Sequence, residues 1–265
     1  MVIISTRPYD TSGLIYEYPA GSVERQVLES LSSSEERYRY DSLEELKFEL
    51  KMRREIVNAS IGLNRSRLHF VVFSESFANY EYWDRTNNGG FKLKKGANPG
   101  KAINDIYING GKYGTECATA MVIVYFKALL NIFGEENFNK LFPDIYLMNW
   151  HRLDPLLKEV GIPKRVADIL IGDRCYFSNP DVDPKTPELQ GENVIVLPSK
   201  LYYGHGFGIT TAKNIIDGLN ENRREGATRS AYFMDNSASR PDFKLLYNRY
   251  FKMQPSAEIP ALLAV

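Results

Sequence analysis

The chain has 265 residues, and its 43% hydrophobic content can fill the core of one large domain or two small ones. Lysine plus arginine and aspartate plus glutamate are equal at 33 each, which argues against a nucleic-acid-binding or membrane-surface protein. Two cysteines cannot form a disulfide framework, and with three histidines no metal-ligand spacing is visible.

The first 40 residues are rich in Tyr, Ser, Gly and Pro and show weak periodicity, so we predict an arm wrapped on the surface. Their opening apolar run, MVIISTRPYD, is too short for a signal peptide and has no basic segment ahead of it. We therefore expect synthesis in a reducing cytosol. A helix is predicted in residues 41–60, because Ser42 and Glu45 have the spacing of a capping box.

Residues 68–73 (LHFVVF) predict a buried strand by their length and their Val and Phe content. An Asn-Gly pair in RTNNGGF predicts a hairpin between residues 80–85 and 91–95. The most apolar segment, 118–133, is shorter than the roughly 20 residues that span a bilayer, and Lys127 interrupts it. We predict a buried helix there, ending at Gly134.

A proline-punctuated middle follows, and the remaining predicted elements are strands at 193–198 and 201–209, a helix at 211–226 and a strand at 230–235. No repeat, low-complexity tract or clean linker divides the chain. We therefore predict a single α+β domain over residues 41–250, with the arm before it and a C-terminal tail at 251–265.

Cys117 stands at the start of the predicted apolar helix, after the segment GGKYGT. Unpaired backbone N–H groups and the helix dipole at that end favour a thiolate. Most free cysteines, however, are small buried hydrophobes, and position alone leaves both readings open. Cys175, in IGDRCYFSNP, has no helix start beside it, and we expect a structural thiol.

Three groups could deprotonate Cys117: its neighbour Glu116, Glu192 in ENVIVLP, and His205 between glycines in YYGHGFGI. Moving a proton from an unperturbed thiol to imidazole costs roughly 2.7 kcal/mol, and to an unperturbed carboxylate about 5.7 kcal/mol. On bare chemistry His205 is the better base. A carboxylate competes only if burial raises its pKa, and a coupled pair of Glu116 and Glu192 would help to do that.

Several motifs in order resemble the protein-glutamine gamma-glutamyltransferase family of bacterial spore coats: SLEELKFELKMRREIV, KAINDI, YGTECATAMVIVYFKAL, GDRCYFSNPDVDP, GENVIVL and YYGHGFGI. The similarity runs from about residue 40 to about residue 235. It implies a fold similar to that of the papain-like NlpC/P60 hydrolases. In that fold the nucleophile lies at the N-terminus of a buried helix that packs on an antiparallel sheet.

The resemblance implies that Cys117 in ECATA is the nucleophile and that Glu192 in GENVI is its principal partner. Glu116 would be a possible substitute, and His205 would support the site rather than act as the main base. These assignments go against the bare pKa comparison, which favours imidazole.

The family also implies aromatic side chains along a passage to the thiol, and Phe70 and Trp150 are the matching candidates here. One departure is Leu189 in PELQ, where an aromatic residue is expected. It would alter the shape of one wall of the passage and leave the chemistry unchanged.

The implied reaction is acyl transfer: a Cys117 thioester forms from a protein glutamine, and a lysine of a second protein attacks it. We expect no cofactor, no metal and no calcium requirement, a monomer, and spore-coat proteins as substrates. Synthesis in the mother cell and assembly on the coat would follow.

Two other classes remain open from the sequence. One is a papain-like cysteine peptidase or amidase that uses Cys117 with His205 and water. The other is a non-catalytic coat or scaffold protein that keeps the fold.

Overall fold

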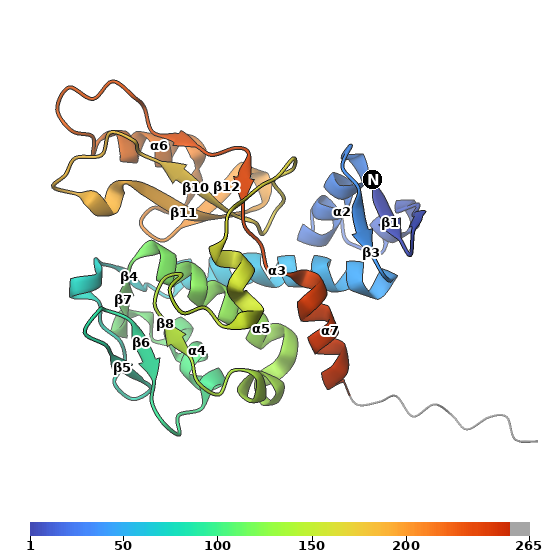
Figure 1. The fold of residues 1–265 in the computed structure, drawn as a ribbon, viewed down its shortest axis with the longest axis horizontal. Helices are drawn as coiled ribbons and strands as arrows, with labels where there is room; N and C mark the ends of the chain where they lie inside the picture. The colour runs from blue at the N-terminus through green and yellow to red at the C-terminus, as the bar shows by residue number, and fades with distance from the viewer. Residues whose placement is uncertain (255–265) are drawn as a thin grey trace, which may run out of the picture.

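In the computed structural model, which describes residues 1–254, a five-stranded antiparallel sheet stands beside a group of helices (Figure 1). The helices are α1 (Ser12–Tyr16), α2 (Val23–Ser33), α3 (Leu43–Arg65), α4 (Pro99–Ile108), α5 (Cys117–Leu141), α6 (Ala212–Asn220) and α7 (Phe243–Met253). The strands are β1 (Val2–Ile4), β2 (Arg7–Pro8), β3 (Tyr38–Tyr40), β4 (His69–Phe70), β5 (Trp83–Arg85), β6 (Phe91–Leu93), β7 (Gly114–Thr115), β8 (Tyr146–Leu147), β9 (Lys164–Arg165), β10 (Arg174–Ser178), β11 (Gly191–Val196), β12 (Leu201–Gly204), β13 (Gly208–Thr211), β14 (Tyr232–Phe233) and β15 (Ser237–Ala238). The large sheet has the order β13-β12-β11-β10-β14.

Helix α5 forms the centre of the core, because nearly every side chain from Ala118 to Phe133 is buried. It packs against α3, α4 and strand β11. Apolar residues on all sides are typical of a helix enclosed in a protein. Its length and composition would also let it cross a membrane, but 78% of its apolar window is buried inside the protein. The prediction of a buried helix is confirmed.

The predicted end of this helix at Gly134 is only partly right. The backbone leaves the helical conformation there, with φ at 74°, a region that glycine adopts without steric cost. A further helical stretch then continues to Leu141 and places Phe138 in the core. The glycine is therefore a kink between two helical segments.

Helix α3 begins where the capping box predicts. Ser42 Oγ accepts a hydrogen bond from the Glu45 N–H at 3.1 Å, and the Glu45 carboxylate accepts one from the Asp41 N–H at 2.7 Å. The helix continues to Arg65, beyond the predicted segment, and runs below the N-terminal lobe toward the side of the molecule that carries the large sheet (Figure 1).

Residues 1–40 form a folded lobe, and the prediction of a surface arm is wrong. Strand β1 pairs antiparallel with β2 and parallel with β3, while α2 packs on α3. Val27, Leu28 and Leu31 of α2 are completely buried. The strands are two or three residues long, which is too short for an alternating pattern to show in the sequence.

The predicted hairpin is confirmed, since β5 and β6 pair antiparallel. The predicted strand at 68–73 is shorter than expected: only β4 is extended, and it pairs with a β7 of two residues. The segment 201–209 contains two strands, β12 and the start of β13, joined by a turn at 205–207. Strand β10, which lies between β11 and the edge strand β14, was not predicted.

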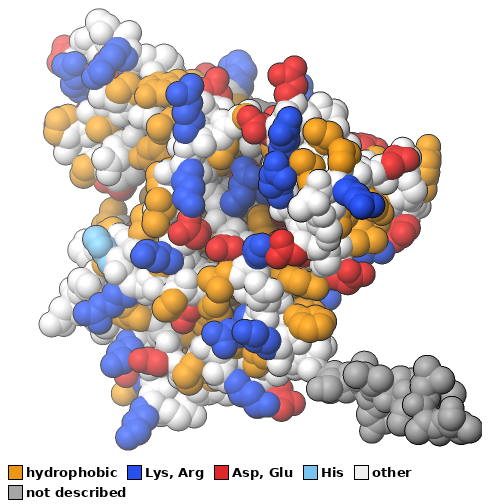
Figure 2. Space-filling view, turned by 45° about the vertical axis from the view of Figure 1, so that its right-hand side comes forward, with side chains coloured by type: hydrophobic (Ala, Val, Ile, Leu, Met, Phe, Trp, Pro, Cys, Tyr) orange, Lys and Arg blue, Asp and Glu red, His pale blue; other side chains and the backbone are white. Residues whose placement is uncertain are grey.

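At the C-terminal end, α7 extends to Met253, past the expected start of the tail at residue 251. The rest of that predicted tail, 255–265, lies outside the described residues. Acidic and basic side chains are interspersed on the face shown in Figure 2, in keeping with the equal numbers of each sign.

Candidate active site

Cys117 is the first residue of α5, and Glu116 is the residue that caps this helix. The Glu116 carboxylate accepts hydrogen bonds from the N–H groups of Ala118, at 2.5 Å, and Thr119, at 2.8 Å, and from the Thr119 hydroxyl. These bonds satisfy N–H groups that have no partner within the helix. Glu116 therefore fixes the start of the helix that presents the thiol.

A cavity of about 580 Å³ opens above Cys117. Its walls come from five parts of the chain: the stretch around Phe70 and Phe73, the start of α5, Asn149, Tyr176 on β10, and the segment from Pro187 to Asn193. Most of this lining is apolar, as expected where water must be kept from a reactive thioester.

Glu192 lies on β11 and is 1% exposed. It does not line the cavity; its neighbours Gly191 and Asn193 do. The Gly206 N–H donates to Glu192 Oε1 at 3.0 Å. Burial raises the pKa of Glu192 to about 8, helped by the charge of Glu116 and opposed by the Gly206 hydrogen bond. Glu192 is thus a carboxyl group that can both give and take a proton near neutral pH.

The surroundings of Cys117 favour the protonated thiol over the thiolate. Burial raises the pKa of Cys117 to about 12, and the charge of Glu192 followed by that of Glu116 adds to this effect. The hydrogen bond from Asn193 works in the opposite direction. Desolvation and the two carboxyl groups thus act against the thiolate that the helix start is expected to favour.

His205 lies beside the site, and it is not among the side chains that line the cavity. Its Nε2 is 3.1 Å from the carbonyl oxygen of His69, and its Nδ1 is 3.4 Å from the Tyr203 hydroxyl. Its ring meets Phe70 edge-on at 5.9 Å between ring centres. Burial lowers the pKa of His205 to about 4, so the ring is neutral at pH 7. These contacts support Phe70 and the β4 backbone.

Of the three predicted passage residues, Phe70 lines the cavity, and Trp150 and Leu189 do not. Trp150 instead stacks on the guanidinium of Arg174, whose carbon is 4.5 Å from the ring centre. Leu189 packs against the apolar cluster on β10 and α6. The prediction is wrong for these two residues, because contacts with distant elements turn their side chains elsewhere.

The sequence reasoning missed Tyr176 and Asn193, which both line the cavity. Asn193 donates to Cys117 Sγ at 3.4 Å. Both lie in motifs that carry the family resemblance, GDRCYFSNPDVDP and GENVIVL, and they are paired across β10 and β11. A predicted pairing of β10 with β11 would have placed both residues beside Glu192, and this is the signal that could have identified them. Cys175 is buried on β10 and is not part of the cavity lining.

We expect Gly204→Ala to displace Glu192 and to lower the rate of amine transfer at least tenfold. A Cβ at position 204 would lie 2.7 Å from Glu192 Oε1 and 2.8 Å from its Cγ, closer than packed atoms allow. Gly206→Ala is the matched control, since its Cβ would stand 3.4 Å from Oε2. Overpacking also destabilises by roughly 1–3 kcal/mol, so melting temperatures accompany the kinetics. Equal rates for both variants would contradict the prediction.

Comparison with known proteins shows which family the whole chain resembles. A family model described as Protein-glutamine gamma-glutamyltransferase matches residues 1–250, so it includes the N-terminal lobe. The protein of that name from Bacillus mycoides (strain KBAB4) is 42% identical over 238 residues, which are 89% of this chain and 84% of the relative. The one from Bacillus cereus (strain 03BB102) is 41% identical over 249 residues, 93% of this chain and 88% of the relative.

Among solved structures, a transglutaminase from Geobacillus stearothermophilus (without C-terminal extension) superimposes with a TM-score of 0.73 at 43% identity. The match covers 78% of this chain and 97% of that one. These findings confirm the resemblance drawn from the motifs and the α+β fold class. The chain therefore belongs to the protein-glutamine gamma-glutamyltransferase family, the bacterial transglutaminases that cross-link proteins through glutamine.

Proposed function

We propose that this transglutaminase works through a Cys117 thioester, with Glu192 as the acid–base partner of the thiol. The observation that carries the assignment is that the Cys117 thiol opens into the cavity, while Glu192 on the adjacent strand β11 is a buried carboxyl group whose charge acts on that thiol. Among charged groups, Glu192 acts most strongly on Cys117. Its pKa of about 8 lies near the pH at which a proton must be exchanged.

The proposed reaction first forms a thioester on Cys117 and then transfers the acyl group to an amine. The thiol proton passes to the Glu192 carboxylate while the sulfur attacks the γ-carboxamide carbon of a protein glutamine. Glu192 then gives that proton to the departing nitrogen, so ammonia leaves and a thioester remains. The amine of a lysine attacks the thioester, Glu192 takes its proton, and the thiolate leaves. Return of the proton to sulfur restores the resting enzyme.

This arrangement favours amine transfer with Glu192 as the base over the alternative, a peptidase in which His205 is the base and water is the acceptor. Burial lowers the pKa of His205 to about 4, which makes it a weak base, and both its ring nitrogens are engaged by His69 and Tyr203. Water would hydrolyse the thioester, and the apolar cavity lining keeps it away. Ammonia release without incorporation of a fluorescent amine would support hydrolysis instead, and incorporation at a comparable rate supports transfer.

We propose that the substrates are spore-coat proteins, that the enzyme is made in the mother-cell cytosol, and that it acts as a monomer. The support is the resemblance of its motifs to the spore-coat family. The test is to add the purified enzyme to extracted coat proteins and to follow detergent-resistant, high-molecular-weight species and ε-(γ-glutamyl)lysine. A coat extract that gains no isopeptide bonds, under conditions where casein does, would refute the choice of substrate.

Activity should survive EDTA and need no added calcium. No group of three or more His, Cys, Asp or Glu side chains within residues 1–254 is arranged to hold a metal ion. The family resemblance leads to the same expectation. The measurement is amine incorporation after dialysis against EDTA, with and without calcium added back. An enzyme that is inactive in EDTA and restored by calcium would contradict it.

A further inference from the structure

The side-chain amide of Asn193 connects Cys117 to a buried arginine. Its Nδ2 donates to Cys117 Sγ at 3.4 Å, and its Oδ1 accepts a hydrogen bond from Arg174 Nη1 at 2.7 Å. An arginine can only donate, so its contact with the amide oxygen leaves the NH₂ end facing the sulfur. The orientation of this amide is therefore set by Arg174.

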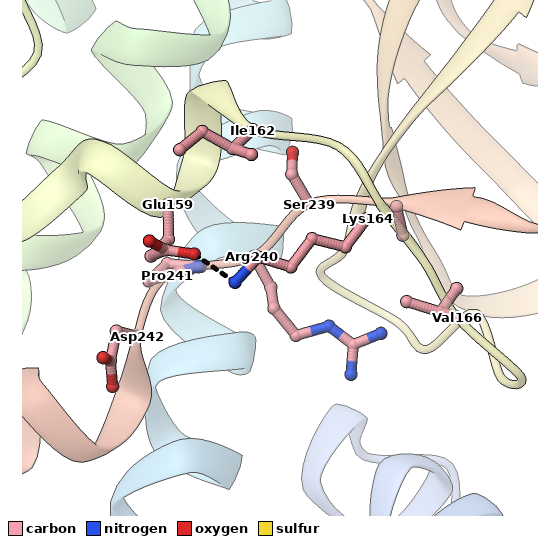
Figure 3. Close-up of a pocket in the computed structure, with 9 residues that line it drawn as sticks. Glu159, Ile162, Lys164, Val166, Ser239, Arg240, Pro241 and Asp242 are labelled. Carbon is pink, nitrogen blue, oxygen red and sulfur yellow. Dashed lines mark ion pairs between the residues drawn. The ribbon is translucent and has the colours of Figure 1, made fainter.

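Arg174 is itself fixed in place from several sides. Its Nε donates to the carbonyl oxygen of Val160 at 3.0 Å and to Ser239 Oγ at 2.7 Å, and its guanidinium stacks on Trp150. Ser239 also lines a separate hollow of about 360 Å³, outside the active-site cavity, together with Arg240 (Figure 3). Arg174 is 5% exposed, so it cannot turn toward water without breaking these contacts.

The sulfur needs a donor when it loses its proton. The thiolate forms beside Glu116 and Glu192, two carboxyl groups whose charges oppose it. A hydrogen bond to the charged form offsets this opposition, and donors to ionised acceptors bind about twice as strongly as those to neutral ones. Among the polar groups of the described residues, Asn193 is the one that bonds to Sγ.

We propose that Asn193 is a further catalytic residue, whose amide stabilises the Cys117 thiolate, and that Arg174 is the positioning residue that aims this amide. The proposal rests on the proposed role of Cys117 as nucleophile. In the step concerned, the S–H bond breaks, the proton goes to Glu192, and the sulfur keeps the electron pair that then attacks the carboxamide. The Asn193 N–H bond to sulfur strengthens as that charge develops.

The test compares Asn193→Ala, Arg174→Gln and the double variant by two measurements. The first is the rate at which iodoacetamide alkylates Cys117 against pH, followed by peptide mass spectrometry. The second is kcat and KM for amine incorporation. We expect Asn193→Ala to slow alkylation at neutral pH and kcat by about 10- to 100-fold, the effect of losing one hydrogen bond to a charged group, with KM little changed.

Arg174→Gln should give a similar loss, and the double variant should be no slower than Asn193→Ala alone. This non-additivity is the sign of positioning, because without the amide Arg174 has nothing to aim. In both single variants the pH profile of Cys117 alkylation should shift to higher pH. The other ionisable groups around the thiol, Glu116, Glu192 and Tyr176, are unchanged in these variants and continue to act on it.

Arg240→Gln is the matched control. It removes a partly buried arginine whose guanidinium donates to Asp173 at 2.7 Å and to the carbonyl oxygen of Asp168 at 3.2 Å, and within the described residues no hydrogen bond joins it to Asn193. We expect a lower melting temperature and unchanged alkylation. If Arg174→Gln fails to fold, Arg174→Lys keeps the buried charge but cannot reach Asn193 and Val160 together, and it should slow alkylation too.

Wild-type alkylation in Asn193→Ala would overturn the inference, as would full additivity in the double variant. Cys117→Ala separates this failure from failure of the proposed function. If that variant is inactive while Asn193→Ala behaves as wild type, only the role of Asn193 is wrong. If Cys117→Ala still incorporates amine, the nucleophile itself is wrong.

Discussion

Cys117→Ala should abolish protein cross-linking and amine incorporation while leaving the melting temperature close to that of the wild type. The thiol opens into the cavity at the start of α5, and its removal leaves the residues that line this cavity without a thiol to form the thioester. The residual rate should fall to the background of the assay, at least about 10⁴-fold below the wild type, as when a nucleophile is removed from other acyl-transfer enzymes.

Cys175→Ser provides the matched control, because it alters the other cysteine of the chain. Cys175 is buried on β10 away from the cavity lining, and burial raises its pKa to about 12. We expect this variant to keep most of its activity and to lose some stability from placing a hydroxyl in an apolar cluster. An inactive but folded Cys175→Ser protein would show that both thiols take part.

Glu192→Gln should lower amine incorporation about 10²- to 10³-fold, the effect of losing a positioned acid–base group. The glutamine side chain keeps the shape and the contact with the Gly206 N–H but cannot carry the proton of the thiol. The fold should therefore persist, and circular dichroism and the melting temperature check that it does.

The pH profile gives the sharper test of Glu192. Its pKa is raised to about 8, so the side chain is mostly protonated at pH 7 and becomes a carboxylate as the pH rises through 8. Only the carboxylate can accept the thiol proton, so the wild-type rate should rise over that range. In Glu192→Gln this rise should be absent. A wild-type profile that is flat between pH 6 and 9 would contradict the assignment.

Glu116→Gln and His205→Asn place this result in context. Glu116→Gln should lower the rate less than Glu192→Gln, because the Glu116 carboxylate is engaged by the N–H groups at the start of α5. The main expected effect of this substitution is a weaker helix cap. The double variant should be slower than either single one. If His205→Asn is inactive while Glu192→Gln keeps near wild-type rates, an ordinary Cys–His pair replaces the carboxylate.

The sequence by itself determined the features that depend on neighbouring residues. The capping box at Ser42, the Asn-Gly hairpin and the apolar helix that begins at Cys117 are all confirmed, because each is decided by residues a few positions apart. The order of several short motifs between about residues 40 and 235, including the one around Glu192, likewise led to the family.

The tertiary structure alone decided what each side chain of the site contacts. Glutamate is not among the residues preferred at a helix cap, so the cap formed by Glu116 could not be predicted from its type. Trp150 stacks on Arg174, and His205 is bound to the backbone of β4; neither contact has a local signal.

The physical reason is sequence separation. Asn193 meets Cys117 across 76 positions and Arg174 across 19, and these contacts exist only after β10 and β11 pair and α5 packs on the sheet. The same packing removes water, which raises the pKa of both Cys117 and Glu192. A sequence shows which ionisable residues are present, whereas their proton affinities depend on burial that the complete fold creates.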